Sequence, residues 1–155
     1  PPEILPDLSS AKEIAIDLET WDPNLRNKGA GWARKDGEIV GIAVATEGWQ
    51  GYLPIRHRGG GNLDETLVFN WLRDLAKTKA DKVCHNASYD IGWLKAEGIE
   101  VKGRIIDTME NLTYKRRKTK KCCTMLHRLG VLMQRVGYMN YQQCMLVNMQ
   151  NKMLP

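Results

Sequence analysis

Ala11-Lys12-Glu13-Ile14-Ala15-Ile16-Asp17-Leu18, which runs on into Glu19-Thr20, is the most informative stretch of this 155-residue chain. Its centre is apolar and rich in strand-forming residues, so it predicts a buried β-strand that ends in carboxylates. Alternate residues of an extended chain point to the same side. We therefore expect Asp17 and Glu19 to face the same way, as oxygen ligands that suit one hard cation.

Further strands and helices are predicted downstream of this stretch. Apolar runs predict strands, and apolar residues at helical spacing predict helices bounded by glycines and turns. The expected strands cover residues 39–45, 50–55, 82–85 and 103–107, the expected helices cover 63–77 and 88–97, turns are expected at 22–24 and 29–37, and a loop at 56–62. The order β-β-β-α-β-α-β predicts an α/β fold in which helices pack on a mixed five-stranded sheet.

A second acidic segment, His85-Asn86-Ala87-Ser88-Tyr89-Asp90, lies between the fourth strand and the second helix. We expect Asp90 inside the first turns of that helix, projecting back toward the sheet edge. Seen alone, this acid could simply favour the helix N-terminus through the helix dipole. Two strand-end acids followed by a meander, a helix, a strand and Asn-x-x-x-Asp form a specific ordered pattern, and the combination favours a catalytic site.

These segments resemble the 3′→5′ proofreading exonuclease domains of family A, polymerase I-like DNA polymerases, particularly those of phages. The resemblance covers roughly residues 10–110 and implies a ribonuclease-H-like fold. Asp17–Thr20 resembles the first exonuclease motif of the family, and Asn86–Asp90 resembles the second. Two further segments, Gly48–Ile55 and Ile106–Met109, resemble neighbouring parts of the same domains.

The resemblance also implies a reaction and the residues that perform it. Family members hydrolyse the terminal phosphodiester of single-stranded DNA 3′ ends with two metal ions, Mg²⁺ or Mn²⁺. By resemblance, Asp17, Glu19 and Asp90 are the catalytic residues and metal ligands. Thr20 and Asn86 would position the 3′-terminal nucleotide. A polymerase domain is expected in the full-length parent, and the chain, which begins at Pro1-Pro2, is expected to be a fragment of it.

The family's third motif, Tyr-x-x-x-Asp, which supplies a fourth carboxylate and a water-orienting tyrosine, is not found here. No Asp or Glu follows Glu110, whereas nine Lys or Arg follow Tyr114. Because the whole chain has a net charge of +5, residues 1–113 have a net charge of −4. We therefore expect a truncated exonuclease domain over 1–110, with the C-terminal part of the fold incomplete, and a basic, poorly packed tail over 111–155. Without the fourth carboxylate the second metal lacks a ligand, and impaired activity is expected.

Back-translation of the tail suggests why the third motif is missing. Read one nucleotide earlier, residues 148–153 permit Tyr-Ala-Glu-Gln-Asp, which matches the third motif. Residues 138–145 permit Tyr-Glu-Leu-Pro-Ala-Met-Tyr in the same frame. We therefore hypothesise a shift of reading frame after about Met109, with some coding sequence lost.

Two other functions stay open on the sequence alone. One is an RNA-trimming 3′→5′ exoribonuclease of the same fold, and the other is an inactive remnant that binds nucleic acid through its basic tail. Trp21 and Trp32, near the first motif, could stack on bases. The four cysteines suggest neither a disulfide framework nor a zinc site. No apolar run is long enough to span a bilayer, so we expect no membrane association and a cytoplasmic protein, in the bacterial host if it is phage-encoded.

Overall fold

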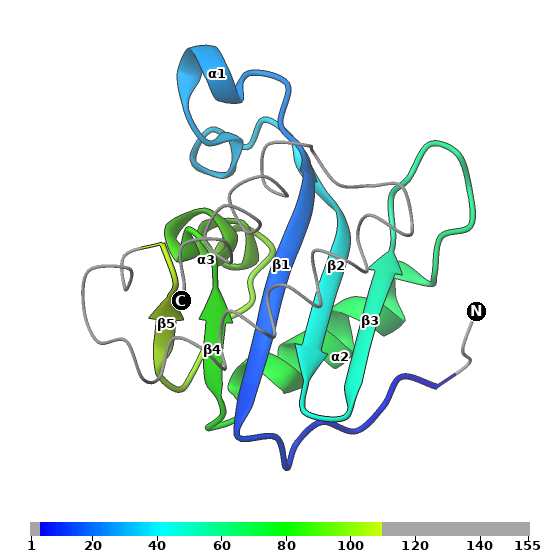
Figure 1. Ribbon diagram of the computed structural model, residues 1–155. Helices are drawn as coiled ribbons and strands as arrows, with labels where there is room; N and C mark the ends of the chain where they lie inside the picture. Colours follow the sequence, from blue (N-terminus) through cyan, green and yellow to red (C-terminus); the bar gives the residue numbers. More distant parts are fainter. Residues whose placement is uncertain (1–3, 110–155) are drawn as a thin grey trace, which may run out of the picture.

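The computed structural model describes residues 4–109 (Figure 1). It contains five strands, three α-helices or helical turns of which α2 and α3 are the long ones, and one 3₁₀ turn: β1 (Glu13–Trp21), α1 (Leu25–Lys28), η1 (Gly31–Ala33), β2 (Glu38–Thr46), β3 (Trp49–Pro54), α2 (Glu65–Lys77), β4 (Asp81–Cys84), α3 (Ala87–Ala96) and β5 (Ile105–Asp107). The expected basic tail over 111–155, its reading frame and the missing third motif lie outside the described residues.

The strands form one mixed sheet in the order β3-β2-β1-β4-β5. β2 is antiparallel to both β1 and β3, whereas β4 is parallel to both β1 and β5. Four strands, β1, β3, β4 and β5, therefore end at the same edge of the sheet, which we call the carboxyl edge. This arrangement confirms the predicted mixed five-stranded sheet with flanking helices, a ribonuclease-H-like α/β fold.

The two faces of the sheet differ in the size of their side chains. Ile14, Ile16 and Leu18 of β1 belong to a large core that also contains residues of α2 and α3, and Figure 1 shows α2 crossing behind the strands. The opposite face is lined by small buried residues, which are Ala15, Ala43, Ala45 and Val83. Large apolar side chains therefore hold the helices on one face, whereas the buried side chains of the other face are short.

The long helix α2 begins where the sequence supplies a cap. The Asp64 side chain accepts a hydrogen bond from the Leu67 amide at 2.7 Å, which satisfies one of the unpaired donors of the first turn. The helix buries an apolar stripe that includes Val68 and Leu72. The helical spacing of apolar residues over 63–77 predicts that Leu67 belongs to this stripe, but Leu67 is 39% exposed, whereas Phe69 is buried.

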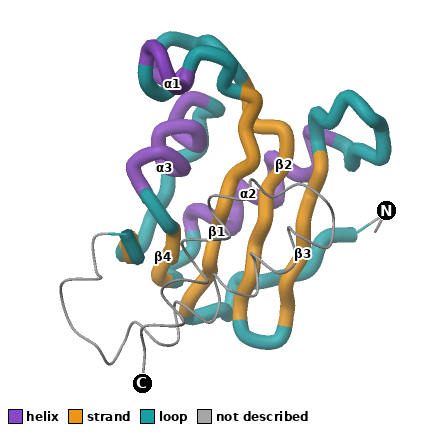
Figure 2. The backbone as a smooth tube through the Cα atoms, turned by 45° about the horizontal axis from the view of Figure 1, so that its top comes forward, coloured by secondary structure: helices purple, strands orange, loops and turns teal. Residues whose placement is uncertain are grey.

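The segment between β1 and β2 was expected to contain turns. It contains two short helical pieces, α1 and η1. Figures 1 and 2 both place this segment beyond the end of β1 and next to α3. Within residues 4–109, no helix is both long and apolar enough to cross a membrane.

Lys82 is a fully buried lysine at the start of β4. Its ammonium group donates hydrogen bonds to the carbonyl oxygens of Thr78, Ala80 and Lys102 at 2.8, 2.9 and 2.9 Å. These carbonyls come from the loop before β4 and the loop before β5. The buried charge therefore ties together the two loops at the edge opposite the carboxyl edge.

Replacing Lys82 should destabilise the fold because buried carbonyl oxygens would lose their donors. We expect Lys82→Met to lower the free energy of unfolding by roughly 2–4 kcal/mol. Lys79→Met, at an exposed position nearby, should change it by less than about 0.5 kcal/mol. Urea denaturation of both variants measures the difference, and equal unfolding midpoints would contradict the structural role of Lys82.

Candidate active site

β1 carries Asp17 and Glu19 to the carboxyl edge on the face opposite α2. Their neighbours on the adjacent strand β2 are small, since Asp17 pairs with Ala43 and Glu19 pairs with Gly41. A Cβ atom at Gly41 would lie 1.9 Å from the Tyr52 hydroxyl oxygen, so the missing side chain makes room for this tyrosine. Both carboxylates are half-buried. Strand alternation thus gives the expected pair its common direction.

Asp90 reaches this pair from the first turns of α3. It is 3% exposed, and its carboxylate accepts a hydrogen bond from the Leu18 amide at 3.3 Å. β1 pairs with β4 only over Glu13–Ala15, so the Leu18 amide has no strand partner on that side. The carboxylate fills this role, and α3 is thereby fixed to β1 between Asp17 and Glu19.

Burial, and for Glu19 and Asp90 also neighbouring negative charge, makes the three carboxylates harder to ionise. Burial raises the pKa of Asp17 to about 6. Burial, and then the negative charge of Asp17, raise the pKa of Glu19 to about 8. The pKa of Asp90 is raised well above its usual range by burial and by the charge of Asp17, with smaller effects of Asp107 and Glu19. The structure therefore brings the three predicted site acids together.

The donor set suits a divalent cation, although the side chains are not arranged as a finished site. Carboxylate oxygens are the ligands that Mg²⁺ and Mn²⁺ prefer, and the crowded negative charge of Asp17, Glu19 and Asp90 would be relieved by a cation. Within residues 4–109, no three His, Cys, Asp or Glu side chains already surround one point at ligand distance. The fit to a metal therefore rests on the chemistry of the three carboxylates.

Asn86 stands at the N-terminus of α3 in the left-handed conformation, with φ of 69°. Such a conformation is uncommon for residues other than glycine, and asparagine tolerates it best. The Asp107 carboxylate accepts hydrogen bonds from the amides of Asn86, Ala87 and Met109 at 3.1, 2.8 and 2.9 Å. Asp107 therefore caps α3, and the exposed Asn86 side chain lies at the carboxyl edge.

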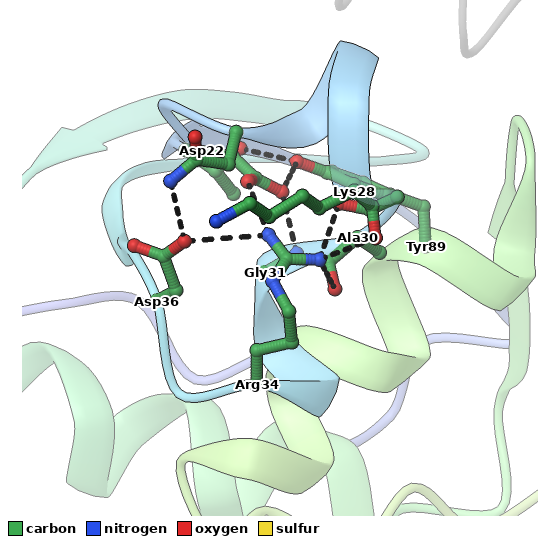
Figure 3. Close-up of polar contacts among 10 residues, drawn as sticks. Asp22, Lys28, Ala30, Gly31, Arg34, Asp36 and Tyr89 are labelled. Atoms are coloured by element: carbon green, nitrogen blue, oxygen red, sulfur yellow. Dashed lines mark hydrogen bonds and ion pairs between the residues drawn. The ribbon is translucent and has the colours of Figure 1, made fainter.

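Thr20 takes part in a hydrogen-bonded chain that the sequence did not reveal. Its hydroxyl lies 2.7 Å from the Tyr89 hydroxyl, which donates to the Asp22 carboxylate at 3.2 Å. Asp22 also accepts from the Gly31 amide at 2.8 Å, and its side chain is 2% exposed (Figure 3). The sequence predicts only a turn at Asp22, because the Asp-Pro-Asn pattern does not indicate a hydrogen bond from a residue of α3.

The segment after β1 is fastened to α3 by packing and by one arginine. A Cβ atom at Gly92 would lie 2.4 Å from the Trp32 indole, so α3 needs glycine there to accept the ring. Arg34 donates to the carbonyl oxygens of Lys28, Gly29 and Ala30, at and just after the end of α1 (Figure 3). Trp32 is thus a packing residue, and the segment that follows the first motif packs against α3.

The comparisons with known proteins agree with this geometry. The model of a 3′-5′ exonuclease family, the domain of family A DNA polymerases, matches residues 2–152. A DNA-directed DNA polymerase of Pseudomonas phage M6 is 48% identical over 99 residues, which are 62% of this chain and 15% of the polymerase. The chain therefore spans a small part of the length of that relative. The family match covers nearly the whole sequence and confirms the resemblance seen in the two acidic motifs: the chain belongs to the 3′→5′ exonuclease domain family of family A DNA polymerases.

Proposed function

We propose that this domain hydrolyses the terminal phosphodiester of single-stranded DNA 3′ ends by a two-metal reaction, as the proofreading part of a longer polymerase. The observation that carries the proposal is the hydrogen bond from the Leu18 amide to Asp90, which inserts a third acid between Asp17 and Glu19. Buried acids without a cationic partner are costly, so their convergence supports a site that works with bound divalent ions.

In this proposal each side chain has a definite task. Asp17, Glu19 and Asp90 hold Mg²⁺ or Mn²⁺, and bound ions of this kind supply an activated water and stabilise charge on the attacking and leaving oxygens. Asn86, exposed at the start of α3, contacts the terminal nucleotide. Thr20, whose hydroxyl is oriented by Tyr89, lies next to Glu19 and positions the same nucleotide.

DNA is the proposed substrate because the phage relative is a DNA-directed DNA polymerase. A polymerase domain would be the partner within the parent protein, which would act in the cytoplasm of a bacterial host. The shift of reading frame after about Met109 is retained as a proposal, because no acid follows Glu110 to complete the ligands of a second metal. The chain as written would then be a weak nuclease or an inactive one.

We expect the restored reading frame, with its lost coding sequence, to release 3′ nucleotides several orders of magnitude faster than the chain as written. The reason is that losing one of several catalytic groups that act together typically costs this much in rate. Release from a labelled single strand in Mg²⁺ or Mn²⁺ measures this. Asp17→Asn in the restored protein should abolish release, and the exposed Asp74→Asn should not. Equal rates from the two frames would show that the third motif is dispensable.

A matched RNA strand in the same assay tests the substrate. We expect the restored protein to release nucleotides faster from DNA than from RNA of the same sequence. Faster release from RNA would favour the exoribonuclease alternative. Release from neither strand, with binding that is lost when residues 111–155 are removed, would favour the inactive remnant.

The raised pKa of Glu19, about 8, predicts how stability depends on pH. The folded protein holds a proton on this group that the unfolded chain has released, so metal-free stability should fall as pH rises from about 4.5 to 8. Glu19→Gln should reduce this fall, whereas the exposed Glu100→Gln should not. Added Mn²⁺ should offset the fall in the wild type, because it favours the ionised carboxylates. Urea denaturation across this pH range measures the slope, and parallel curves for wild type and Glu19→Gln would contradict the assignment.

A further inference from the structure

Trp21 is a half-exposed tryptophan on the strand that carries the catalytic pair. The register shift between β1 and β2 leaves Val40 of β2 without a partner, so β1 itself keeps its alternation through Asp17, Glu19 and Trp21. Residues two apart on one face of a strand lie about 7 Å apart. Trp21 is 46% exposed, which places an accessible aromatic ring directly beyond Glu19 at the carboxyl edge.

A cation lies over this ring. The guanidinium carbon of Arg58 is 5.6 Å from the centre of the Trp21 ring, within the range of a cation–π contact. Among residues 4–109, Arg58 has no carboxylate within ion-pair distance, whereas Arg34, Arg56 and Arg104 each have at least one. Its charge is therefore available to a phosphate.

The loop that carries Arg58 is anchored at both ends. Arg56 forms ion pairs with Glu38, Glu65 and Glu97, which belong to β2, α2 and the end of α3. The Asn62 side chain accepts from the His57 amide and donates to the His57 carbonyl oxygen, each at 2.8 Å. Arg58 follows these two fixed residues, so the backbone brings it to the carboxyl edge beside Trp21.

We propose that Trp21 and Arg58 form a binding subsite for the strand that leads to the cleaved end: the indole stacks on a base and the guanidinium contacts a backbone phosphate. This inference rests on the proposed function, because the subsite takes its direction from Asp17 and Glu19 on the same strand face. An aromatic face with an adjacent cation is the combination that holds single-stranded nucleic acid without reading its sequence. The site therefore favours no particular base.

The test measures binding and salt dependence with the full chain. The probe is a short 5′-fluorescein-labelled oligothymidylate in EDTA, followed by fluorescence anisotropy at several salt concentrations. Trp21→Ala should weaken binding about tenfold or more, and Trp21→Phe should keep most of the affinity, because a stacking face is retained. Arg58→Ala should weaken binding and also reduce the slope of log K against log salt by about 0.7, the effect of one lost phosphate contact.

Arg104→Ala is the matched control. Arg104 is an exposed arginine paired with Asp81. It lies immediately before β5, at the opposite edge of the sheet, and its loss should alter neither affinity nor salt slope. Circular dichroism confirms that each variant is folded; Arg58→Ala keeps the test decisive if Trp21→Ala unfolds. Wild-type affinity in Trp21→Ala, or an unchanged salt slope in Arg58→Ala, would overturn the subsite. Binding that depends on both residues without nucleotide release by the restored frame in Mn²⁺ would count instead against the proposed function.

Discussion

The hydrogen bond between the Leu18 amide and the Asp90 carboxylate is the contact on which the site depends. β1 and β4 separate after Ala15, and a buried amide without a partner would cost free energy of about 1–3 kcal/mol. Asp90 supplies the acceptor from a helix, where a strand would otherwise continue. The same contact that satisfies the backbone also delivers a negative charge to the two carboxylates of β1.

This arrangement places function in opposition to stability. Burial raises the pKa of Asp17 to about 6, and burial together with the charge of Asp17 raises the pKa of Glu19 to about 8. Asp107, close by, differs because its carboxylate accepts hydrogen bonds from three backbone amides, those of Asn86 and Ala87 at the start of α3 and that of Met109. Two kinds of carboxylate thus share one edge. Asp107 is stabilised by hydrogen bonds from the backbone, whereas Asp17, Glu19 and Asp90 are held together at a cost in free energy that a divalent ion would remove.

The sequence predicted every strand and both long helices to within a few residues, because each has a strong apolar period or a clear cap. It also identified Asp17, Glu19 and Asp90 as a group, since strand alternation and a strand-to-helix junction determine where such side chains point. It did not predict the exposure of Leu67, which depends on the exact rotation of α2 over the sheet. The link from Thr20 through Tyr89 to Asp22 was missed for a similar reason: its members lie up to 69 positions apart, and no local pattern encodes such a contact.

Strand direction explains why the candidate site and the Trp21–Arg58 pair occupy the same edge. β1 ends in Glu19 and Trp21, β3 leads into Arg56 and Arg58, and both strands run the same way because each is antiparallel to β2. Parallel strands collect their carboxyl ends, and ligands in α/β sheets bind beyond these ends. The bulge at Val40 adds a local adjustment, because its carbonyl oxygen accepts from the amides of Ile55 and Arg56 at 3.0 and 3.2 Å. One unpaired residue in β2 thereby fixes the start of the loop that brings a positive charge to an edge otherwise dominated by carboxylates.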